Sequence, residues 1–365
     1  MKILHVVGAR PNFVKAAPVM RALRGRAEQT LVHTGQHYDA AMSTVLFDDL
    51  GLPRPDVDLR VGSGAASVQT GRILLRLDPL FPRYRPDVCV VYGDVTSTLA
   101  AALAAAQHGV PVAHVEAGLR SNDRTMPEER NRILTDHVAD WLFTPSRDAN
   151  DNLAREGVAS GRVHLVGNVM IDSLSRLLPR TDTDAVLRRL AVPPDARFVL
   201  VTLHRPSTVD EGAVLPKVLG ALEEVSRRWP VVFPVHPRTR ARLDAVRAAA
   251  AGLRLTEPLG YLDFLSLEKG AAVVVTDSGG VQEETTWLGV PCLTVRDATE
   301  RPVTVTAGTN TVVGRDAGRL RGAIEAVLAG GGRRGGGRPR LWDGRAAERI
   351  ARVLAAEGGG GHAGR

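Results

Sequence analysis

The sequence is poor in the residues on which several classes of protein depend. Among 365 residues there are 2 cysteines, and aromatic residues make up 4%. Cys89 and Cys292 each lie in an apolar, strand-like run, which indicates two core residues rather than a disulfide framework. There is also no H-E-x-x-H motif and no cluster of cysteine and histidine, so we expect no metal site.

Long apolar segments and targeting signals are missing as well. No run reaches the roughly 18 apolar residues that a membrane-spanning helix needs. The opening MKILHVVGARP is interrupted too early for a signal peptide and is typical of a first β-strand. We therefore expect a cytoplasmic protein without a membrane segment.

The basic charge is almost entirely arginine. The formal net charge is +7, yet lysine occurs only at positions 2, 15, 217 and 269. A basic excess suits a small anionic substrate. Because the chain shows neither zinc-finger spacing nor an aromatic RNA-binding signature, we expect no nucleic acid partner.

Two nucleotide-binding fingerprints are also lacking. The stretch GSGAAS (62–67) fails the G-x-G-x-x-G pattern at its last position and follows no strong strand, and no G-x-x-x-x-G-K-[ST] motif occurs. This favours neither a dinucleotide site nor a P-loop. We expect a protein that works without a cofactor, including NAD.

What the sequence does contain is a regular alternation of short apolar runs and amphipathic stretches. Early examples of the apolar runs are 2–8, 87–94 and 110–118. This rhythm predicts parallel βαβ units, and it starts again at 196–204. We therefore predict an α/β protein with two Rossmann-like, doubly wound parallel-sheet domains that face a deep cleft.

The predicted boundaries follow from the same pattern. They place the first domain at 1–170, the second at 171–343, a last helix at about 344–357 and a disordered tail at 358–365. The Gly/Arg-rich stretch 329–342 is a low-complexity excursion.

The turn GARP (8–11) follows the first predicted strand. Gly8 allows a tight turn, and Arg10 could hold a phosphate at the start of a helix. A plain turn with a solvated arginine explains the motif equally well.

The stretch TDSGGVQEE (276–284) places Ser278 at or near a helix N-cap after an apolar strand. The amides of Gly279 and Gly280 could approach a phosphate, and Glu284 could accept ribose hydroxyls. A capped helix with acidic residues in its first turns is the plainer alternative.

Other polar residues also follow predicted strands. Asp94 by itself is more typical of a helix N-cap, and Arg301 lies in a charged loop that could flank a second anion site. His204 and His236 each end a strand and could face the cleft, although single histidines there are commonly loop residues.

The segment HVEAGLRSNDRTMPEERNR (114–132) is the densest cluster of charge. It fits either a solvated, salt-bridged loop or an acid/base site for a charged substrate. Read alone, the segment supports the two interpretations about equally.

These motifs occur in the same order as in the non-hydrolysing UDP-N-acetylglucosamine 2-epimerases, which the chain resembles from residue 1 to about 355. The segments that carry the resemblance include GARPNFVKAAPV, VYGDVTST, HVEAGLRS, PEERNR, TLHRPS, PVHPR, TDSGGVQEE and RDATERPVTVTAGTN. The resemblance implies a GT-B-like fold, a last helix that packs on the first domain, and a cytoplasmic homodimer that acts in polysaccharide biosynthesis.

The resemblance also implies the reaction, which is conversion of UDP-N-acetylglucosamine to UDP-N-acetylmannosamine through loss and re-addition of UDP. The implied catalytic residues are Asp94, Glu116, Glu128 and His204. With these roles we expect Arg120 and Arg132 to orient Glu116 and Glu128, and we leave the other charged residues of 114–132 to a solvated loop: Asp123, Arg124, Glu129 and Arg130. The implied substrate-binding residues are Arg10, His236, Ser278, Gly279, Gly280, Glu284 and Arg301.

The chain departs from many bacterial members in two places. His204 and Arg205 are followed by Pro206 rather than a second arginine, and Asp39 ends a run whose residues contact an activating second substrate in the family. The same chemistry on a modified sugar such as a UDP-diacetamido-uronic acid, a GT-B glycosyltransferase and a non-catalytic nucleotide-sugar sensor remain alternatives.

Overall fold

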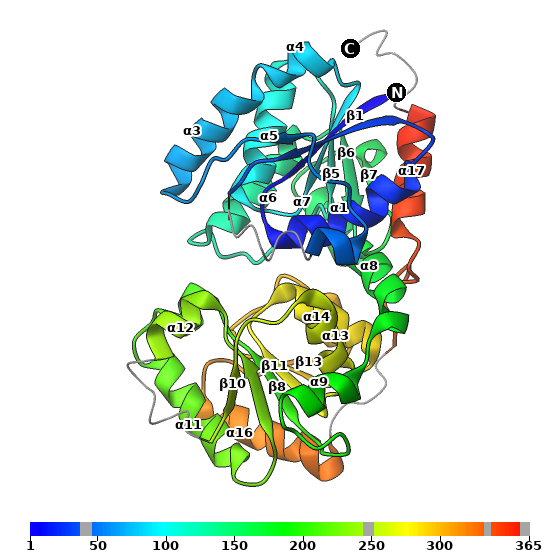
Figure 1. The fold of residues 1–365 in the computed structure, drawn as a ribbon. Helices are drawn as coiled ribbons and strands as arrows, with labels where there is room; N and C mark the ends of the chain where they lie inside the picture. Colours follow the sequence, from blue (N-terminus) through cyan, green and yellow to red (C-terminus); the bar gives the residue numbers. More distant parts are fainter. Residues whose placement is uncertain (37–45, 244–251, 332–336, 358–365) are drawn as a thin grey trace. The chain divides into compact units, whose positions relative to one another are not determined.

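The computed structural model describes residues 1–36, 46–243, 252–331 and 337–357. The chain divides into two units, of which the first contains Met1–Arg176 with the chain from Arg340 onward, and the second contains Leu177–Pro339 (Figure 1). The expected disordered tail, 358–365, and Asp39 of the departing run lie outside the described residues.

The first unit is built on a 7-stranded parallel sheet with strand order β3-β2-β1-β4-β5-β6-β7. Its strands are β1 (Lys2–Val7), β2 (Glu28–His33), β3 (Val57–Asp58), β4 (Val88–Tyr92), β5 (Val112–Val115), β6 (Trp141–Thr144) and β7 (Val163–Leu165). Its helices are α1 (Arg10–Ala22), α3 (Ala66–Leu77), α4 (Leu80–Tyr84), α5 (Thr96–Gln107), α6 (Pro127–Val138), α7 (Arg147–Arg155), α8 (Val169–Leu177, which ends at the boundary) and α17 (Ala346–Glu357).

Local sequence explains the helices that lie closest to the charged residues. α5 is rich in alanine, the strongest helix former, and its small side chains allow contact with both α3 and α6. α6 begins with Pro127 at its first position and carries Glu128 and Glu129 in its first turn, as a helix start favours. On the other side of this unit, the C-terminal helix α17 lies against α1 (Figure 1).

The second unit repeats the design with a 6-stranded parallel sheet in the order β10-β9-β8-β11-β12-β13. Its strands are β8 (Val199–Thr202), β9 (Val231–Pro234), β10 (Arg254–Thr256), β11 (Val273–Thr276), β12 (Cys292–Thr294) and β13 (Asn310–Val312). Its helices are α9 (Thr183–Arg189), α10 (Pro206–Val209), α11 (Val214–Ser226), α12 (Pro237–Leu243), α13 (Tyr261–Gly270), α14 (Gly279–Leu288), α15 (Pro302–Thr306) and α16 (Ala317–Ala326).

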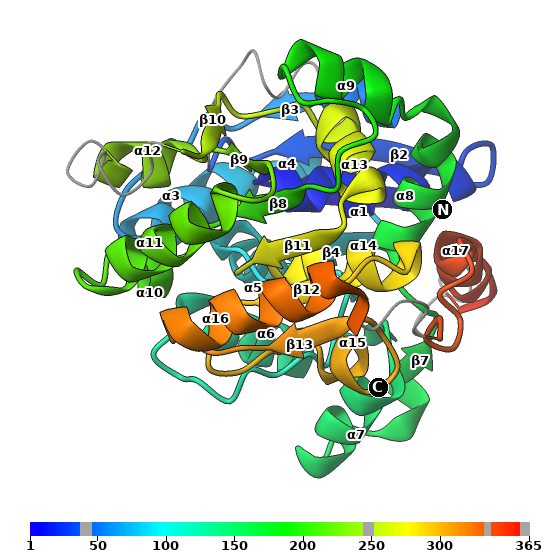
Figure 2. The same ribbon diagram turned by 90° about the horizontal axis from the view of Figure 1, so that it is seen from below.

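Both faces of this second sheet are covered, which is why its strands are apolar throughout. Val199 and Val201 belong to the core cluster that includes α11 and α16, whereas Phe198 and Leu200 belong to the cluster with α9 and α13 (Figure 2). Alternate residues along β8 and the residue before it therefore pack into two cores, one on each face of the sheet. The prediction of two doubly wound parallel sheets is confirmed.

The strand order reverses at one point in each sheet, between β1 and β4 and between β8 and β11. In open α/β sheets, ligands bind beyond the carboxyl ends of the strands at such a point. Each sheet therefore has one place where a ligand is expected, at the carboxyl ends of β1 and β4 and of β8 and β11.

Candidate active site

Several of the polar residues singled out from sequence follow strands at or next to the two reversal points. In the first unit, Arg10 opens α1 after β1, Asp94 follows β4, and Glu116 comes directly after β5. In the second unit, His204 follows β8 and Ser278 follows β11.

The turn between β1 and α1 is held by a side chain. The amides of Gly8 and Ala9 donate to Asn12 Oδ1 at 3.0 and 3.1 Å, and Asn12 Nδ2 donates to the carbonyl of Tyr92 at 2.8 Å. A Cβ on Gly8 would lie 2.0 Å from Ser97 Oγ, so close packing rather than a positive φ requires glycine there. Because Asn12 already occupies these amides, the exposed Arg10 is the stronger candidate for an anion at this turn.

Glu116 forms a buried ion pair that the sequence did not predict. Its carboxylate contacts the ammonium of Lys15 on α1, and the two side chains are only 3% and 5% exposed. The backbone of Glu116 has φ +75, a strained conformation for a residue other than glycine. A Cβ on Gly93 would lie 2.7 Å from Lys15 Nζ, so the β4 turn packs directly on this pair.

Asp94 is held by an arginine of α6. Arg132 Nη2 donates to Asp94 Oδ2, and Arg132 Nη1 lies 3.2 Å from Glu129 Oε2. Glu129 accepts the amides of Ser121 and Asn122 at 2.9 and 2.8 Å. Glu129 therefore ties the loop before α6 to the residue that orients Asp94.

Two predictions about the charged segment need correction. Glu129 was assigned to a solvated loop, but it is buried, whereas Glu128 beside it is exposed. The predicted role of Arg120 beside Glu116 and Glu128 is wrong, because Arg120 pairs with Asp136 at 2.7 Å and forms a bidentate ion pair with Glu156.

In the second unit, α14 begins at Gly279 with Ser278 as its N-cap residue. The Ser278 side chain makes no capping hydrogen bond, so the plainer alternative of a serine-capped helix is not what the structure contains. A Cβ on Gly279 would lie 2.2 Å from Arg301 Nη1. Glycine here lets a guanidinium approach the positive end of a helix, which suits an anionic ligand.

Arg301 belongs to a cluster of three arginines around one carboxylate. Buried Glu300 pairs with Arg205 Nη2 at 3.1 Å, with Arg296 Nη1 at 2.6 Å and with Arg301 Nη1 at 2.6 Å. Arg301 Nε also contacts Glu283 Oε1 at 2.8 Å. Three cations against two carboxylates leave a net positive charge beside α14.

The two histidines predicted from sequence lie together. The ring centroids of His204 and His236 are 5.3 Å apart. Fully buried Asp277 accepts the amides of His204 and Arg205 at 3.0 and 2.9 Å and lies 3.3 Å from His204 Nδ1. Burial lowers the pKa of His204, and Asp277 opposes the shift.

Glu284 lies buried in the second turn of α14. Tyr261 Oη donates to Glu284 Oε1 at 2.5 Å. Burial raises the pKa of Glu284 to about 7, the Tyr261 hydrogen bond opposes the shift, and Glu283 adds to it. This carboxyl group can therefore accept from or donate to a ligand hydroxyl near neutral pH.

The structure thus brings several site residues of each unit together and adds others. Sequence reasoning missed the contributions of Lys15, Asn12, Glu129 and Arg205, whereas Arg296 and Glu300 belong to the charged loop that it had noted around Arg301. A usable signal existed for Lys15, since lysine is rare in this chain and this one lies in an apolar helix. Nothing in the local sequence distinguished Glu129 from Glu128.

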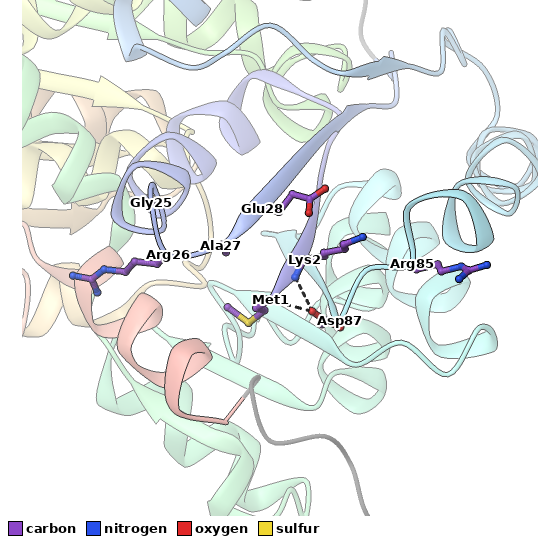
Figure 3. Close-up of a pocket in the computed structure, with 8 residues that line it drawn as sticks. All are labelled: Met1, Lys2, Gly25, Arg26, Ala27, Glu28, Arg85 and Asp87. Carbon is purple, nitrogen blue, oxygen red and sulfur yellow. Dashed lines mark hydrogen bonds and ion pairs between the residues drawn. The ribbon is translucent and has the colours of Figure 1, made fainter.

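A hollow of about 620 Å³ lies elsewhere, at the amino ends of β1, β2 and β4 (Figure 3). Its lining includes Lys2, Glu28 and Asp87, and Asp87 accepts the Lys2 amide at 2.6 Å. The candidate residues follow the carboxyl ends of the strands, whereas this hollow lies at the amino ends. We therefore do not assign it to the site. Among the described residues, no helix is long and apolar enough to cross a membrane, and no acidic, histidine or cysteine group could hold a metal ion.

Comparison with known proteins gives the family. Residues 21–355 match the family model described as UDP-N-acetylglucosamine 2-epimerase. The chain is 40% identical to the UDP-N-acetylglucosamine 2-epimerase of Methanocaldococcus jannaschii, over 97% of this chain and 99% of that protein. It is also 40% identical to the UDP-2,3-diacetamido-2,3-dideoxy-D-glucuronate 2-epimerase of Pseudomonas aeruginosa, again over 97% of this chain and 99% of that one.

A solved structure of a relative has the same fold. The crystal structure of the Methanocaldococcus jannaschii UDP-GlcNAc 2-epimerase in complex with UDP-GlcNAc and UDP matches with a TM-score of 0.90 and 39% identity, covering 98% of this chain and 100% of that one. The chain therefore belongs to the UDP-N-acetylglucosamine 2-epimerase family.

Proposed function

We propose that this chain interconverts UDP-N-acetylglucosamine and UDP-N-acetylmannosamine by eliminating UDP and adding it back. The observation that carries the proposal is the placement of Asp94 and Glu116 at adjacent strand ends, each held by a cation, in a chain that belongs to this family. Binding alone would not need carboxylates fixed in this way, which argues against a nucleotide-sugar sensor.

The chemistry requires proton transfer at C2 and departure of an anion from C1. A base removes the C2 proton while the C1–O bond breaks and the electron pair leaves with UDP, which gives a glycal. Addition of UDP oxygen to C1 and of a proton to the other face of C2 completes the epimerisation. We assign proton transfer and charge stabilisation to Asp94, Glu116 and Glu128.

The second unit supplies groups suited to the nucleotide. We assign the diphosphate to Arg301, to the amides of Gly279 and Gly280 at the start of α14 and to Ser278, with His204 and His236 close to it. Arg10 is a further phosphate ligand. Support comes from the net positive charge around Glu300 and from the missing serine cap. Glu284 is assigned to the ribose hydroxyls.

Proton NMR in heavy water tests the proposal. With UDP-GlcNAc and no added NAD, the protein is expected to introduce deuterium at C2, to form UDP-ManNAc and to release UDP and glycal slowly. Changing Asp94, Glu116 or Glu128 to its amide should abolish exchange while UDP still binds. Absence of both exchange and UDP-ManNAc would exclude this substrate, and full activity in all three variants would refute the site assignment.

A second candidate is the same reaction on a diacetamido-uronic acid sugar. The identity to the Pseudomonas aeruginosa enzyme equals that to the Methanocaldococcus jannaschii enzyme, so overall similarity does not separate the two substrates. Exchange rates on both UDP sugars, compared as kcat/KM, decide between them, and the preferred substrate should exchange at C2 in either case.

A further inference from the structure

A buried histidine joins the ends of the two strands that carry Asp94 and Glu116. His114 lies in β5 with its ring fully buried. Its Nε2 lies 2.7 Å from the carbonyl oxygen of Gly93, and its Nδ1 lies 2.7 Å from Asp136 Oδ1. The ring therefore bridges the end of β4 and helix α6.

Both neighbours of this ring are hydrogen-bond acceptors. A backbone carbonyl can only accept, so Nε2 must donate. Burial alone would raise the pKa of Asp136, but His114 and Arg120 bring it below its ordinary value, so this carboxylate also accepts. Nε2 therefore carries the hydrogen that bonds Gly93, and Nδ1 faces the Asp136 carboxylate.

The ring lies in a chain of charged groups. Asp136 contacts His114 and Arg120, Arg120 continues to Glu156, and Glu156 lies 3.2 Å from His137. Displacing the His114 ring would therefore disturb Asp136 and the contacts that depend on it.

The atoms that the ring holds lie next to the candidate catalytic groups. Gly93 immediately precedes Asp94, and a Cβ on Gly93 would lie 3.2 Å from Glu116 Oε2. Asp136 also accepts the amide of Gly118 at 3.0 Å, two residues after Glu116. A shift of either bond would therefore move the backbone on which Asp94 and Glu116 depend.

We propose that His114, which bonds the Gly93 carbonyl through Nε2 and contacts Asp136 through Nδ1, is a positioning residue that sets the geometry of Asp94 and Glu116. The inference rests on the proposed function because it concerns the carboxylates assigned to proton transfer. His114 acts only through the backbone and Asp136, and it touches no substrate atom.

The variant His114→Asn tests the bond to Gly93. The asparagine amide can still donate to Asp136 from about the place of Nδ1, but it cannot reach the Gly93 carbonyl. Since displacements of about 1 Å can cost roughly a hundredfold in rate, we expect kcat for C2 exchange to fall about tenfold to a hundredfold. KM and the UDP dissociation constant should change little, because the assigned nucleotide ligands lie mainly in the second unit.

The variant Asp136→Asn is the conservative arm. Its amide can donate to Nδ1 of a neutral His114 while Nε2 still donates to Gly93, so it should retain more activity than His114→Asn. A matched control is His5→Asn, because His5 is an equally buried histidine whose ring contacts are Tyr92 Oη and Gln29. The control should lower Tm comparably while kcat stays near the wild-type value.

The ring protonation is measured directly by two-bond ¹H–¹⁵N NMR of histidine-labelled protein, with the His114 signal assigned by its loss in His114→Asn. The expected signal shows a hydrogen on Nε2. A ring with its hydrogen on Nδ1 alone overturns the proposal whatever the activity, and so does unchanged kcat in His114→Asn. Absence of exchange in the wild-type protein would instead contradict the proposed function.

Discussion

At the scale of single residues, Lys15 and Glu116 form a buried ion pair in the first unit. Two opposite charges are taken out of water together, and removing one leaves the other uncompensated. The partner of Glu116 comes from α1, about a hundred residues earlier in the chain. Sequence proximity could therefore not reveal it, and it suggested Arg120 instead.

We predict that Lys15→Met lowers both stability and activity. Loss of one member of a buried pair costs about 3–5 kcal/mol of unfolding free energy. Loss of a correctly held acid/base group costs roughly a hundredfold or more in rate. The double variant Lys15→Met/Glu116→Gln should recover stability in denaturant titrations but not C2 exchange. Recovery of neither property, or no loss in the single variant, would contradict this description of the pair.

A second residue-scale prediction concerns Glu284 and pH. Its pKa is about 7 in the folded chain against an ordinary 4.5, so the folded state binds more protons between these values. Stability is then highest below the ordinary pKa and falls as pH rises through this window. Glu284→Gln should make the unfolding free energy depend less on pH, measured by denaturant titration across the window.

Exposed Glu257, which pairs with Arg240 at 2.6 Å, offers the control Glu257→Gln. That change should leave the pH dependence as in the wild-type protein. Identical slopes for the Glu284→Gln variant and the wild-type protein would show that Glu284 is not the group responsible.

The residue scale also shows where sequence reasoning fails. Glu128 and Glu129 are adjacent in one helix turn, and only their different faces decide that Glu129 is buried and Glu128 exposed. The helix start at Pro127 was readable, but the phase of the helix against the loop 121–122 was not. That phase depends on tertiary contacts of Arg132, which no local pattern encodes.

At the scale of elements, the start of α14 depends on Gly279. We predict that Gly279→Ala weakens UDP binding at least tenfold, because the new methyl group would displace the Arg301 guanidinium. Calorimetric titration with UDP measures the effect. Gly220→Ala in α11 is the matched control, since no atom lies within 4 Å of its added Cβ. Equal affinity in the Gly279→Ala variant would refute a role for this close approach.

The C-terminal helix α17 is anchored by a residue far away in sequence. Asp172 accepts the amides of Ala346 and Ala347 at 3.1 and 2.7 Å, so it satisfies orphan donors at the start of this helix. We predict that Asp172→Ala costs about 1–2 kcal/mol and increases hydrogen exchange within α17. Asp182→Ala removes the equivalent bond to Ala185 in α9 and should destabilise without affecting α17.

Among the elements, the central strands were predictable and the edge was not. β4 and β11 are uninterrupted apolar runs, which a strand buried on both faces requires. β3 contains only Val57 and Asp58, too short to show a period, and it forms by pairing with β2. The helices α3 and α4 that follow it were not predicted either.

At the scale of the whole molecule, the chain repeats one strand order in two units and gives each a different chemistry. The first sheet ends in carboxylates paired with cations, and the second ends in an arginine cluster beside a helix start. The restart of the βα rhythm predicted the repetition. Loss and re-addition of UDP is the central claim of the proposed mechanism.

The position of oxygen in the sugar–phosphate bond tests that claim most directly. UDP-N-acetylglucosamine labelled with ¹⁸O in the bridge between C1 and the β-phosphorus is incubated with the protein, and the recovered substrate is examined by ³¹P NMR. If UDP departs and returns, the β-phosphate can rotate, so the label is expected to spread into non-bridging positions as C2 exchanges with solvent. Exchange at C2 with the label still wholly in the bridge would contradict elimination.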